Sequence, residues 1–242
     1  MKIIANSPYV STKPNLNLIN LLADNPYNKN CPLLIVSDVD STFIKQEVIE
    51  LIADYAGVRN QVAEITQRAM RGEIDFVQSL IERVSLLTGL RADVLTDIRS
   101  SIELSDGASS LVDYVNEQGH IFALVSGGFT QVLDPLCDEY GIKNRCANRL
   151  EIVNGVLTGR LLGSIIDAQA KAHYLHELAQ QLSIPKSNVI AVGDGANDLL
   201  MLKAASWSVS FNGKPVVQEA SKIQIEGPYF DHIIGLITYP AM

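Results

Sequence analysis

Two aspartates follow directly on an apolar run near residue 36, in the segment SDVDST (residues 37–42). Residues two apart on an extended segment point to the same side, so the carboxylates of Asp38 and Asp40 converge where the preceding strand ends. A single capping aspartate at a strand end is the ordinary explanation for one of them. The other explanation is a site that uses both carboxylates, and this motif alone leaves the two explanations open.

Further groups of the same chemical kind follow later in the chain. The segment GDGAND (residues 193–198) adds Asp194 and Asp198 at the end of another apolar run. Mg²⁺ prefers sites of few carboxylates completed by water and substrate phosphate. The segment SGGF (residues 126–129) offers the Ser126 hydroxyl and the backbone N–H groups near Gly127 just before a helix, which suits a phosphate oxygen.

Lys171, in AQAKAHYL, lies at the start of another helical segment and adds a positive charge. Each motif alone also has an ordinary interpretation: SGG as a tight turn, GDGAND as an Asx turn without metal, and Lys171 as an exposed helix charge. Carboxylates, a hydroxyl, glycines and a lysine together are typical of Mg²⁺-dependent phosphoryl transfer.

Three apolar runs must position these groups. They lie in CPLLIVSDVD (31–40), HIFALVSGGF (120–129) and NVIAVGDGAND (188–198), and each ends in a polar turn. Continuous apolar runs are typical of strands covered on both faces, and parallel α/β sheets bind ligands at the carboxyl ends of their strands. The sequence therefore predicts an α/β fold, with a Rossmann-like parallel sheet core and helices on both faces.

The stretch between the first two strands has a different pattern. Four segments in 45–103 carry apolar residues at three- and four-residue spacing, which predicts an inserted helical cap. Further on, Asn154-Gly155 stands between two β-like runs and predicts a small β-hairpin flap. The expected organisation is an N-terminal tether (1–32), a core (33–44 and 104–242) and the cap (45–103).

Composition excludes some partners. The formal net charge of −8 argues against a nucleic-acid binder, and no apolar run approaches the length that spans a bilayer. Cys31, Cys137 and Cys146 are far apart and form no metal or redox motif, so we expect free thiols in the cytoplasm. The sequence leaves open whether the protein is a monomer or a homodimer.

The motifs DVDST, SGGF, the lysine of AQAKAHYL and GDGAND stand in this order, with a helical cap after the first. In this they resemble the four motifs of the haloacid-dehalogenase-like phosphatases. Ser41, where many relatives carry glycine, and the cap segments RAMRGEIDF (68–76) and RVSLL (83–87) are similar to the phosphoserine phosphatase family within that superfamily. The resemblance runs from Leu33 to the C-terminal region.

The resemblance implies a division of labour between the first two carboxylates. Asp38 is the expected nucleophile, which forms an aspartyl-phosphate. Asp40 is the expected general acid for the leaving oxygen and then the general base for the attacking water. By the same resemblance, Mg²⁺ is the cofactor, and it is held by the side chain of Asp38, the backbone carbonyl of Asp40 and the side chain of Asp194.

The resemblance also assigns the phosphate-binding groups. Ser126, the amides near Gly127, and Lys171 are expected to hold the transferring oxygens. Asn197 is expected to orient the substrate, and Asp198 to support Lys171 or a metal-bound water.

Two charged cap residues match the family's substrate readers. Glu47 is expected to bind an ammonium group and Arg83 a carboxylate, which arginine binds in a two-pronged way. Without the resemblance, both would be ordinary solvated helix charges. Met70 and Phe76 are expected either to close over the substrate or to belong to the apolar interior of the cap.

The implied activity is hydrolysis of O-phospho-L-serine, a small-molecule substrate, to serine and phosphate in serine biosynthesis. One alternative is a related phosphatase or phosphotransferase for another small phosphomonoester, such as phosphohomoserine or phosphoethanolamine. A second alternative is a phospho-receiver signalling module, which also uses an aspartate pocket, Mg²⁺, a hydroxyl and a lysine. A general acid at Asp40 and a substrate-sized cap argue against a receiver.

Overall fold

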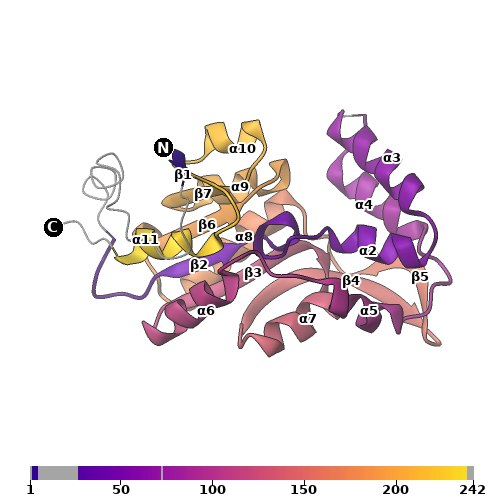
Figure 1. The fold of residues 1–242 in the computed structure, drawn as a ribbon, viewed down its shortest axis with the longest axis horizontal. Coiled ribbons are helices and arrows are strands. Elements are labelled where there is room, and N and C mark those ends of the chain that lie inside the picture. The colour runs from indigo at the N-terminus through magenta and orange to yellow at the C-terminus, as the bar shows by residue number, and fades with distance from the viewer. Residues whose placement is uncertain (1, 5–26, 72, 239–242) are drawn as a thin grey trace.

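A sheet of eight strands forms the centre of the structure, a computed structural model that describes residues 2–4, 27–71 and 73–238 (Figure 1). The strand order is β1-β8-β7-β6-β2-β3-β4-β5, and all neighbours are parallel except the antiparallel pair β4 and β5. The strands are β1 (Lys2–Ile4), β2 (Leu34–Ser37), β3 (Ile121–Phe129), β4 (Asn144–Val153), β5 (Val156–Leu162), β6 (Val189–Gly193), β7 (Trp207–Phe211) and β8 (Ile223–Glu226).

Helices cover both faces of this sheet (Figure 1). The helices are α2 (Val48–Tyr55), α3 (Arg59–Met70), α4 (Phe76–Ser85), α5 (Val94–Asp97), α6 (Ala108–Glu117), α7 (Thr130–Glu139), α8 (Ala168–Gln181), α9 (Leu199–Ala204), α10 (Pro215–Ala220) and α11 (Ile233–Thr238). The predicted fold class is therefore confirmed.

Strand alternation divides the core into two apolar layers. On β2, Ile35 belongs to the layer packed against α6, α7 and α11, while Leu34 and Val36 belong to the layer packed against α8, α9 and α10. The same alternation holds on β3 and β6. Both faces of these strands are buried, which explains why their sequences read as continuous apolar runs.

Helices α2 to α5 gather around the part of the sheet formed by β4 and β5, and they fall within the range predicted for the cap (Figure 1). The predicted hairpin is confirmed, because β4 and β5 join through Asn154 and Gly155, at φ 50° and 77°. The division into cap and core stays a prediction. Most of the predicted tether (residues 5–26) lies outside the described residues, and the sequence did not anticipate edge strand β1.

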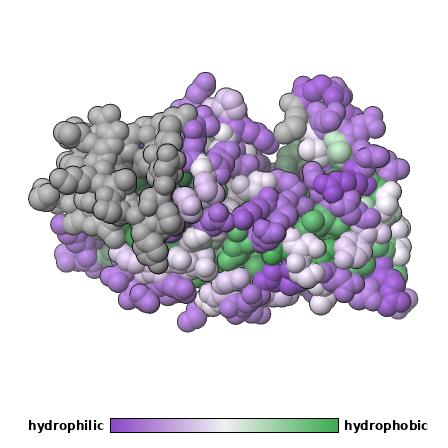
Figure 2. All heavy atoms as spheres, in the orientation of Figure 1, coloured by the Kyte–Doolittle hydropathy of each residue, from purple (hydrophilic) through white to green (hydrophobic). Residues whose placement is uncertain are grey.

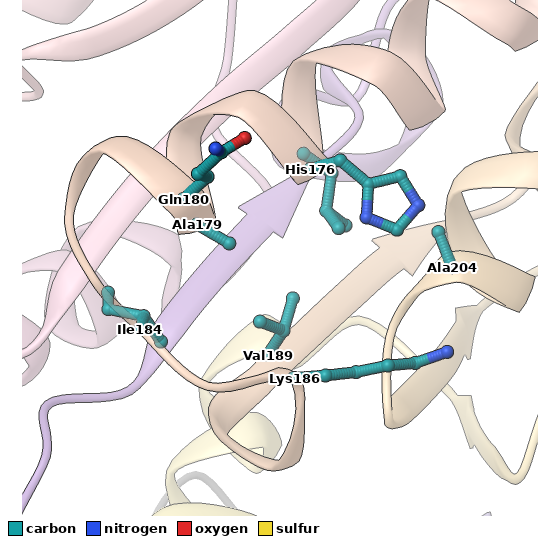
Figure 3. A pocket seen from close by; sticks show the side chains of 8 residues that line it. His176, Ala179, Gln180, Ile184, Lys186, Val189 and Ala204 are labelled. Atoms are coloured by element: carbon teal, nitrogen blue, oxygen red, sulfur yellow. The ribbon is translucent and has the colours of Figure 1, made fainter.

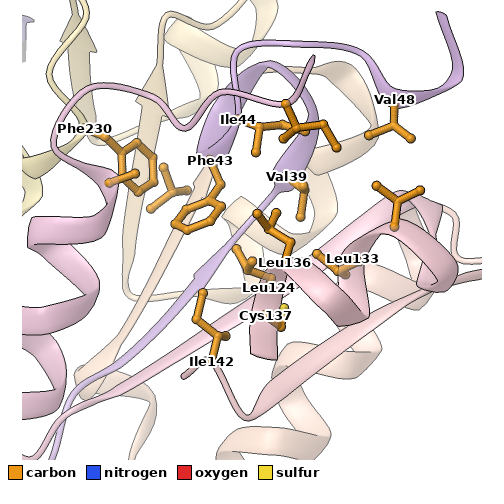
Figure 4. Packing of buried hydrophobic residues seen from close by; sticks show 14 of the residues in the cluster. Val39, Phe43, Ile44, Val48, Leu124, Leu133, Leu136, Cys137, Ile142 and Phe230 are labelled. Atoms are coloured by element: carbon orange, nitrogen blue, oxygen red, sulfur yellow. The ribbon is translucent and has the colours of Figure 1, made fainter. Parts of the chain in front are cut away.

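The order of the central strands matters most for function. The strands that lead into the three motifs are neighbours, in the order β6-β2-β3, so their carboxyl ends meet at one edge of the sheet. The turn after β2 is anchored by the buried side chains of Val39 and Phe43, which point into the core near Leu124 and Phe230 (Figure 4). Inward packing of Val39 leaves Asp38 and Asp40 free to face the site.

The surface seen in the orientation of Figure 1 is mostly hydrophilic, with smaller hydrophobic patches (Figure 2). Among the described residues, no helix combines the length and the apolar character needed to span a membrane.

Candidate active site

A buried lysine lies between two carboxylates at the ends of β2 and β6. Lys171 Nζ donates to Asp38 Oδ1 at 2.5 Å and to Asp198 Oδ1 at 2.7 Å. The lysine side chain has no exposed surface, and α8 delivers it from its first turn. Such short charge-assisted bonds, shielded from water, fix the direction of the Asp38 carboxylate.

A third carboxylate completes this cluster. Oxygens of Asp38, Asp194 and Asp198 all lie within 4.8 Å of one another. Thr42 Oγ1 donates to Asp194 Oδ1 at 3.1 Å, and the backbone N–H of Gly195 donates to Asp198 Oδ2 at 3.0 Å, so both carboxylates are held in place. Hard carboxylate oxygens at this spacing suit a divalent cation such as Mg²⁺.

The charge balance of the cluster favours such a cation. Burial lowers the pKa of Lys171, but the carboxylates of Asp198 and Asp38 outweigh it and raise the pKa overall. One lysine cannot neutralise three carboxylates. Accordingly, burial and the charge of Asp198 raise the pKa of Asp38 well above its usual value, and the same two causes raise the pKa of Asp194 to about 6.

Mg²⁺ is therefore expected to stabilise the protein more at pH 7.5 than at pH 5. Below the ordinary pKa of an aspartate, Asp194 is protonated in both the folded and the unfolded protein. The folded protein keeps this proton up to a pKa of about 6, so the stability that Asp194 contributes is lost as the pH rises from the ordinary pKa through about 6. A metal needs the deprotonated carboxylate and offsets that loss. Melting temperatures with Mg²⁺ and with EDTA at both pH values measure this, and Asp194→Asn should abolish the difference. Equal Mg²⁺ shifts at both pH values would contradict the metal assignment.

Asp40 faces a separate set of partners. Its Oδ1 accepts from the backbone N–H of Val48 at 2.9 Å, and its Oδ2 accepts from Ser126 Oγ at 3.2 Å. Ser126 Oγ in turn accepts from the backbone N–H of Gly128 at 2.7 Å. Burial, followed by the negative charge of Glu47, raises the pKa of Asp40 to about 7. A carboxyl group with this pKa can give and take a proton near neutral pH.

Gly127 lies directly against the ring of Phe76. A Cβ at Gly127 would lie 2.9 Å from Cζ of Phe76, so only glycine fits there without moving the ring. Phe76 is the first residue of α4, so this contact joins α4 to β3. Met70 ends α3, and its side chain is not among those described. Asn197 follows β6, and its Oδ1 lies against Gly195.

Glu47 and Arg83 lie near Asp40 rather than within the carboxylate–lysine cluster. Glu47 Oε1 accepts from Ser41 Oγ at 2.9 Å. Arg83 is partly buried on α4; burial lowers its pKa, while the charges of Glu47 and Asp40 oppose this. Among the residues that the structure describes, no ion pair joins Glu47 to Arg83, and Arg83 Nε donates instead to the Ser79 carbonyl at 3.2 Å.

The predicted residues fall into three groups. The first is the carboxylate–lysine cluster, in which Lys171 binds Asp38 and Asp198. It contains Asp198 besides the predicted side-chain ligands Asp38 and Asp194. The expected contribution of Asp40 to metal binding is its backbone carbonyl, and this stays a prediction. The other two groups are Asp40 with the Ser126 loop, and the pair Glu47 and Arg83.

Sequence reasoning missed two residues of this region. Thr42 orients Asp194, and its place in the DVDST motif was the only signal for it. Asn148, in β4, contacts the glycine loop through Gly127, and no motif indicates it.

A cavity of about 300 Å³ lies elsewhere, between α8, α9 and the start of β6 (Figure 3). His176, Gln180 and Lys186 lie on its rim, over apolar residues such as Ala179 and Val189. None of the predicted site residues lines it, so the chemistry described above does not use this cavity.

Comparison with known proteins adds family relationships to this geometry. The family model described as haloacid dehalogenase-like hydrolase matches residues 35–203. A phosphoserine phosphatase of Streptomyces coelicolor is 48% identical over 84% of this chain, and the chain spans only 50% of the length of that relative. A phosphoserine phosphatase of Streptococcus thermophilus is 43% identical, over 84% of this chain and 95% of the relative.

A solved structure has the same architecture. A phosphoserine phosphatase with a phospho-aspartyl intermediate analogue aligns with a TM-score of 0.80 and 36% identity, over 85% of this chain and 98% of that one.

Proposed function

The chain belongs to the haloacid dehalogenase-like hydrolase family, and from this premise we propose that it hydrolyses O-phospho-L-serine to L-serine and phosphate. The relatives named phosphoserine phosphatase, at 43% and 48% identity, support this substrate. The reaction would be the last step of serine biosynthesis.

One observation carries the proposed chemistry: two neighbouring aspartates have different surroundings. Asp38 is bonded to Lys171 beside the other carboxylates, whereas Asp40 is bonded to Ser126 and has a pKa of about 7. Pairs of titratable groups in contrasting environments are typical of enzymes that assign one group to nucleophilic attack and the other to proton transfer. We assign the first role to Asp38 and the second to Asp40.

In the first step, an oxygen of Asp38 attacks phosphorus and forms an aspartyl-phosphate while the bond to the serine oxygen breaks. The proton of Asp40 goes to that leaving oxygen. In the second step, a water gives its proton to Asp40 and attacks the phosphorus. Phosphate leaves, the Asp38 carboxylate is regenerated, and Asp40 is again protonated.

The phosphate oxygens are held by Lys171, by the Ser126 hydroxyl and by the amides near Gly127. In this assignment, Asp38, Asp194 and the backbone carbonyl of Asp40 would hold Mg²⁺, which when bound would supply positive charge that offsets the repulsion between carboxylates and phosphate. Asp198 keeps Lys171 in place through its 2.7 Å bond. Asn197 orients the substrate.

The cap supplies the selectivity in this proposal. Glu47 binds the substrate ammonium and Arg83 its carboxylate, since both charges lie near Asp40, which receives the leaving oxygen. Phe76 lies over Gly127 and shields the site from water when the cap (45–103) is closed. A cytoplasmic location, and a monomer or homodimer, stay predictions.

A panel of phosphomonoesters tests the substrate. Phosphate release is measured from L-phosphoserine, phosphohomoserine, phosphoethanolamine and p-nitrophenyl phosphate, each with Mg²⁺. We expect a clear preference for L-phosphoserine. Similar activity on all four compounds would agree with the aspartyl-phosphate chemistry and would refute L-phosphoserine as the preferred substrate.

Arg83→Ala tests the carboxylate reader. It should lower kcat/KM for L-phosphoserine by about 10- to 100-fold, the range for a lost charged hydrogen bond, and leave phosphoethanolamine, which lacks the carboxylate, nearly unchanged. Arg91→Ala, at a cap arginine whose side chain is 79% exposed, is the matched control and should change neither. Equal losses with both substrates would show that Arg83 acts structurally.

A further inference from the structure

Asn148 makes two backbone contacts beside the site, and none of the roles assigned above includes it. It is 2% exposed. Its Nδ2 donates to the carbonyl of Gly127 at 2.8 Å, and its Oδ1 accepts from the backbone N–H of Ile166 at 2.8 Å. The side-chain amide therefore bridges two segments that are far apart in sequence.

The first contact lies at an irregularity of the sheet. Val125 pairs with Cys146, but the next pair is Phe129 with Asn148, so three residues of β3 stand opposite one residue of β4. Residues in such a bulge leave the ladder and lose its hydrogen bonds. Asn148 supplies a side-chain donor to the Gly127 carbonyl in this bulge.

The bulge is the proposed phosphate loop, and it contains two consecutive glycines. Glycine has more accessible backbone conformations than other residues, so this loop needs contacts from outside to keep one shape. The peptide between Gly127 and Gly128 is held at both ends: Asn148 binds its carbonyl, and Ser126 Oγ accepts from its N–H at 2.7 Å. Ser126 Oγ also donates to Asp40 at 3.2 Å.

The second contact reaches the helix that carries the lysine. Ile166 immediately precedes Asp167, which caps α8 by accepting from the N–H of Ala170 at 2.9 Å. The backbone N–H of Lys171 bonds to the Asp167 carbonyl at 2.9 Å. Asn148 therefore ties the glycine loop to the start of α8, and both elements present groups to the same phosphate.

We propose that Asn148 is a positioning residue that holds the Ser126–Gly128 loop and the start of α8 in register for binding phosphate. This inference rests on the proposed phosphate-binding role of those two elements. It does not depend on which alcohol the phosphate is esterified to.

The chain offers a matched control. Asn188 is also fully buried and also binds backbone groups, with Nδ2 donating to the carbonyl of Asn28 at 2.8 Å and of Cys31 at 3.0 Å. It precedes β6, at the end of that strand opposite to Asp194. Replacing it removes a comparable buried amide far from the site.

The experiment compares Asn148→Ala and Asn148→Ser with Asn188→Ala in the full chain with Mg²⁺, well below each melting temperature. The readouts are the dissociation constant of inorganic phosphate and kcat/KM for p-nitrophenyl phosphate. We expect the Asn148 variants to weaken phosphate binding about 10-fold, to lower kcat/KM at least as much, and to keep the ratio of activities on L-phosphoserine and phosphoethanolamine. Asn188→Ala should lower the melting temperature and leave phosphate binding within about twofold.

Wild-type-like phosphate binding in a folded Asn148 variant would overturn the proposal. A loss of phosphate affinity in Asn188→Ala as large as that in Asn148→Ala would overturn it too. The serine variant keeps a polar group at the site and serves if the alanine variant does not fold. Failure of the wild type to prefer L-phosphoserine would refute the proposed substrate and leave the two main readouts intact, because inorganic phosphate and p-nitrophenyl phosphate lack the serine moiety.

Discussion

Asp38→Asn is expected to abolish turnover and phosphoenzyme formation together. The amide has nearly the shape of the carboxylate but is a poor nucleophile, so kcat should fall by at least about 10⁴-fold. The variant should fold, because Lys171 keeps its bond to Asp198. Steady-state phosphate release and acid-stable labelling with radioactive substrate measure the two effects.

Asp134→Asn is the control for this variant, since Asp134 pairs with Arg145 at the surface, away from the cluster. It should keep wild-type kinetics. Appreciable turnover by Asp38→Asn, with a normal label on the protein, would show that another group attacks phosphorus.

Lys171→Met is expected to impair both stability and catalysis. The methionine side chain fits the volume but leaves Asp38 and Asp198 buried without their cation. Breaking a buried ion pair in this way typically costs about 3–5 kcal/mol of unfolding free energy. Loss of a charged group that holds the transferring oxygens should also lower kcat by about 10²- to 10³-fold. Chemical denaturation and steady-state kinetics measure these losses.

Exposed Lys143 provides the comparison, and Lys143→Met should change neither quantity measurably. The destabilisation of Lys171→Met should be smaller with Mg²⁺ than with EDTA, because the metal replaces part of the missing positive charge. A Lys171→Met protein with wild-type stability and rate would contradict the central place given to this lysine.

The sequence allowed the outline of the site to be predicted because its carboxylates follow the ends of two strands, β2 and β6. Apolar runs before SDVDST, SGGF and GDGAND indicated three parallel strands, and their carboxyl ends meet at one edge, as expected. The side-by-side order β6-β2-β3, however, came only from the structure. Local patterns give each strand, but strand order depends on packing between distant segments.

Asn148 shows what local patterns miss. Its contacts exist because β3 bulges opposite a single residue of β4, and nothing near position 148 in the sequence encodes that register.

Glu47 and Arg83 are a related case. Their helical patterns predicted amphipathic helices correctly, but their positions near Asp40 result from how the helices of residues 45–103 pack. Only the family resemblance singled them out.

The most direct test of the account is the amount of phosphate that the wild-type protein releases from O-phospho-L-serine with Mg²⁺, counted per molecule of protein. Hydrolytic turnover predicts many equivalents of phosphate per protein molecule, with release suppressed by EDTA. Release of one equivalent or less would contradict hydrolytic turnover and favour a phospho-receiver, in which the same aspartate holds its phosphate.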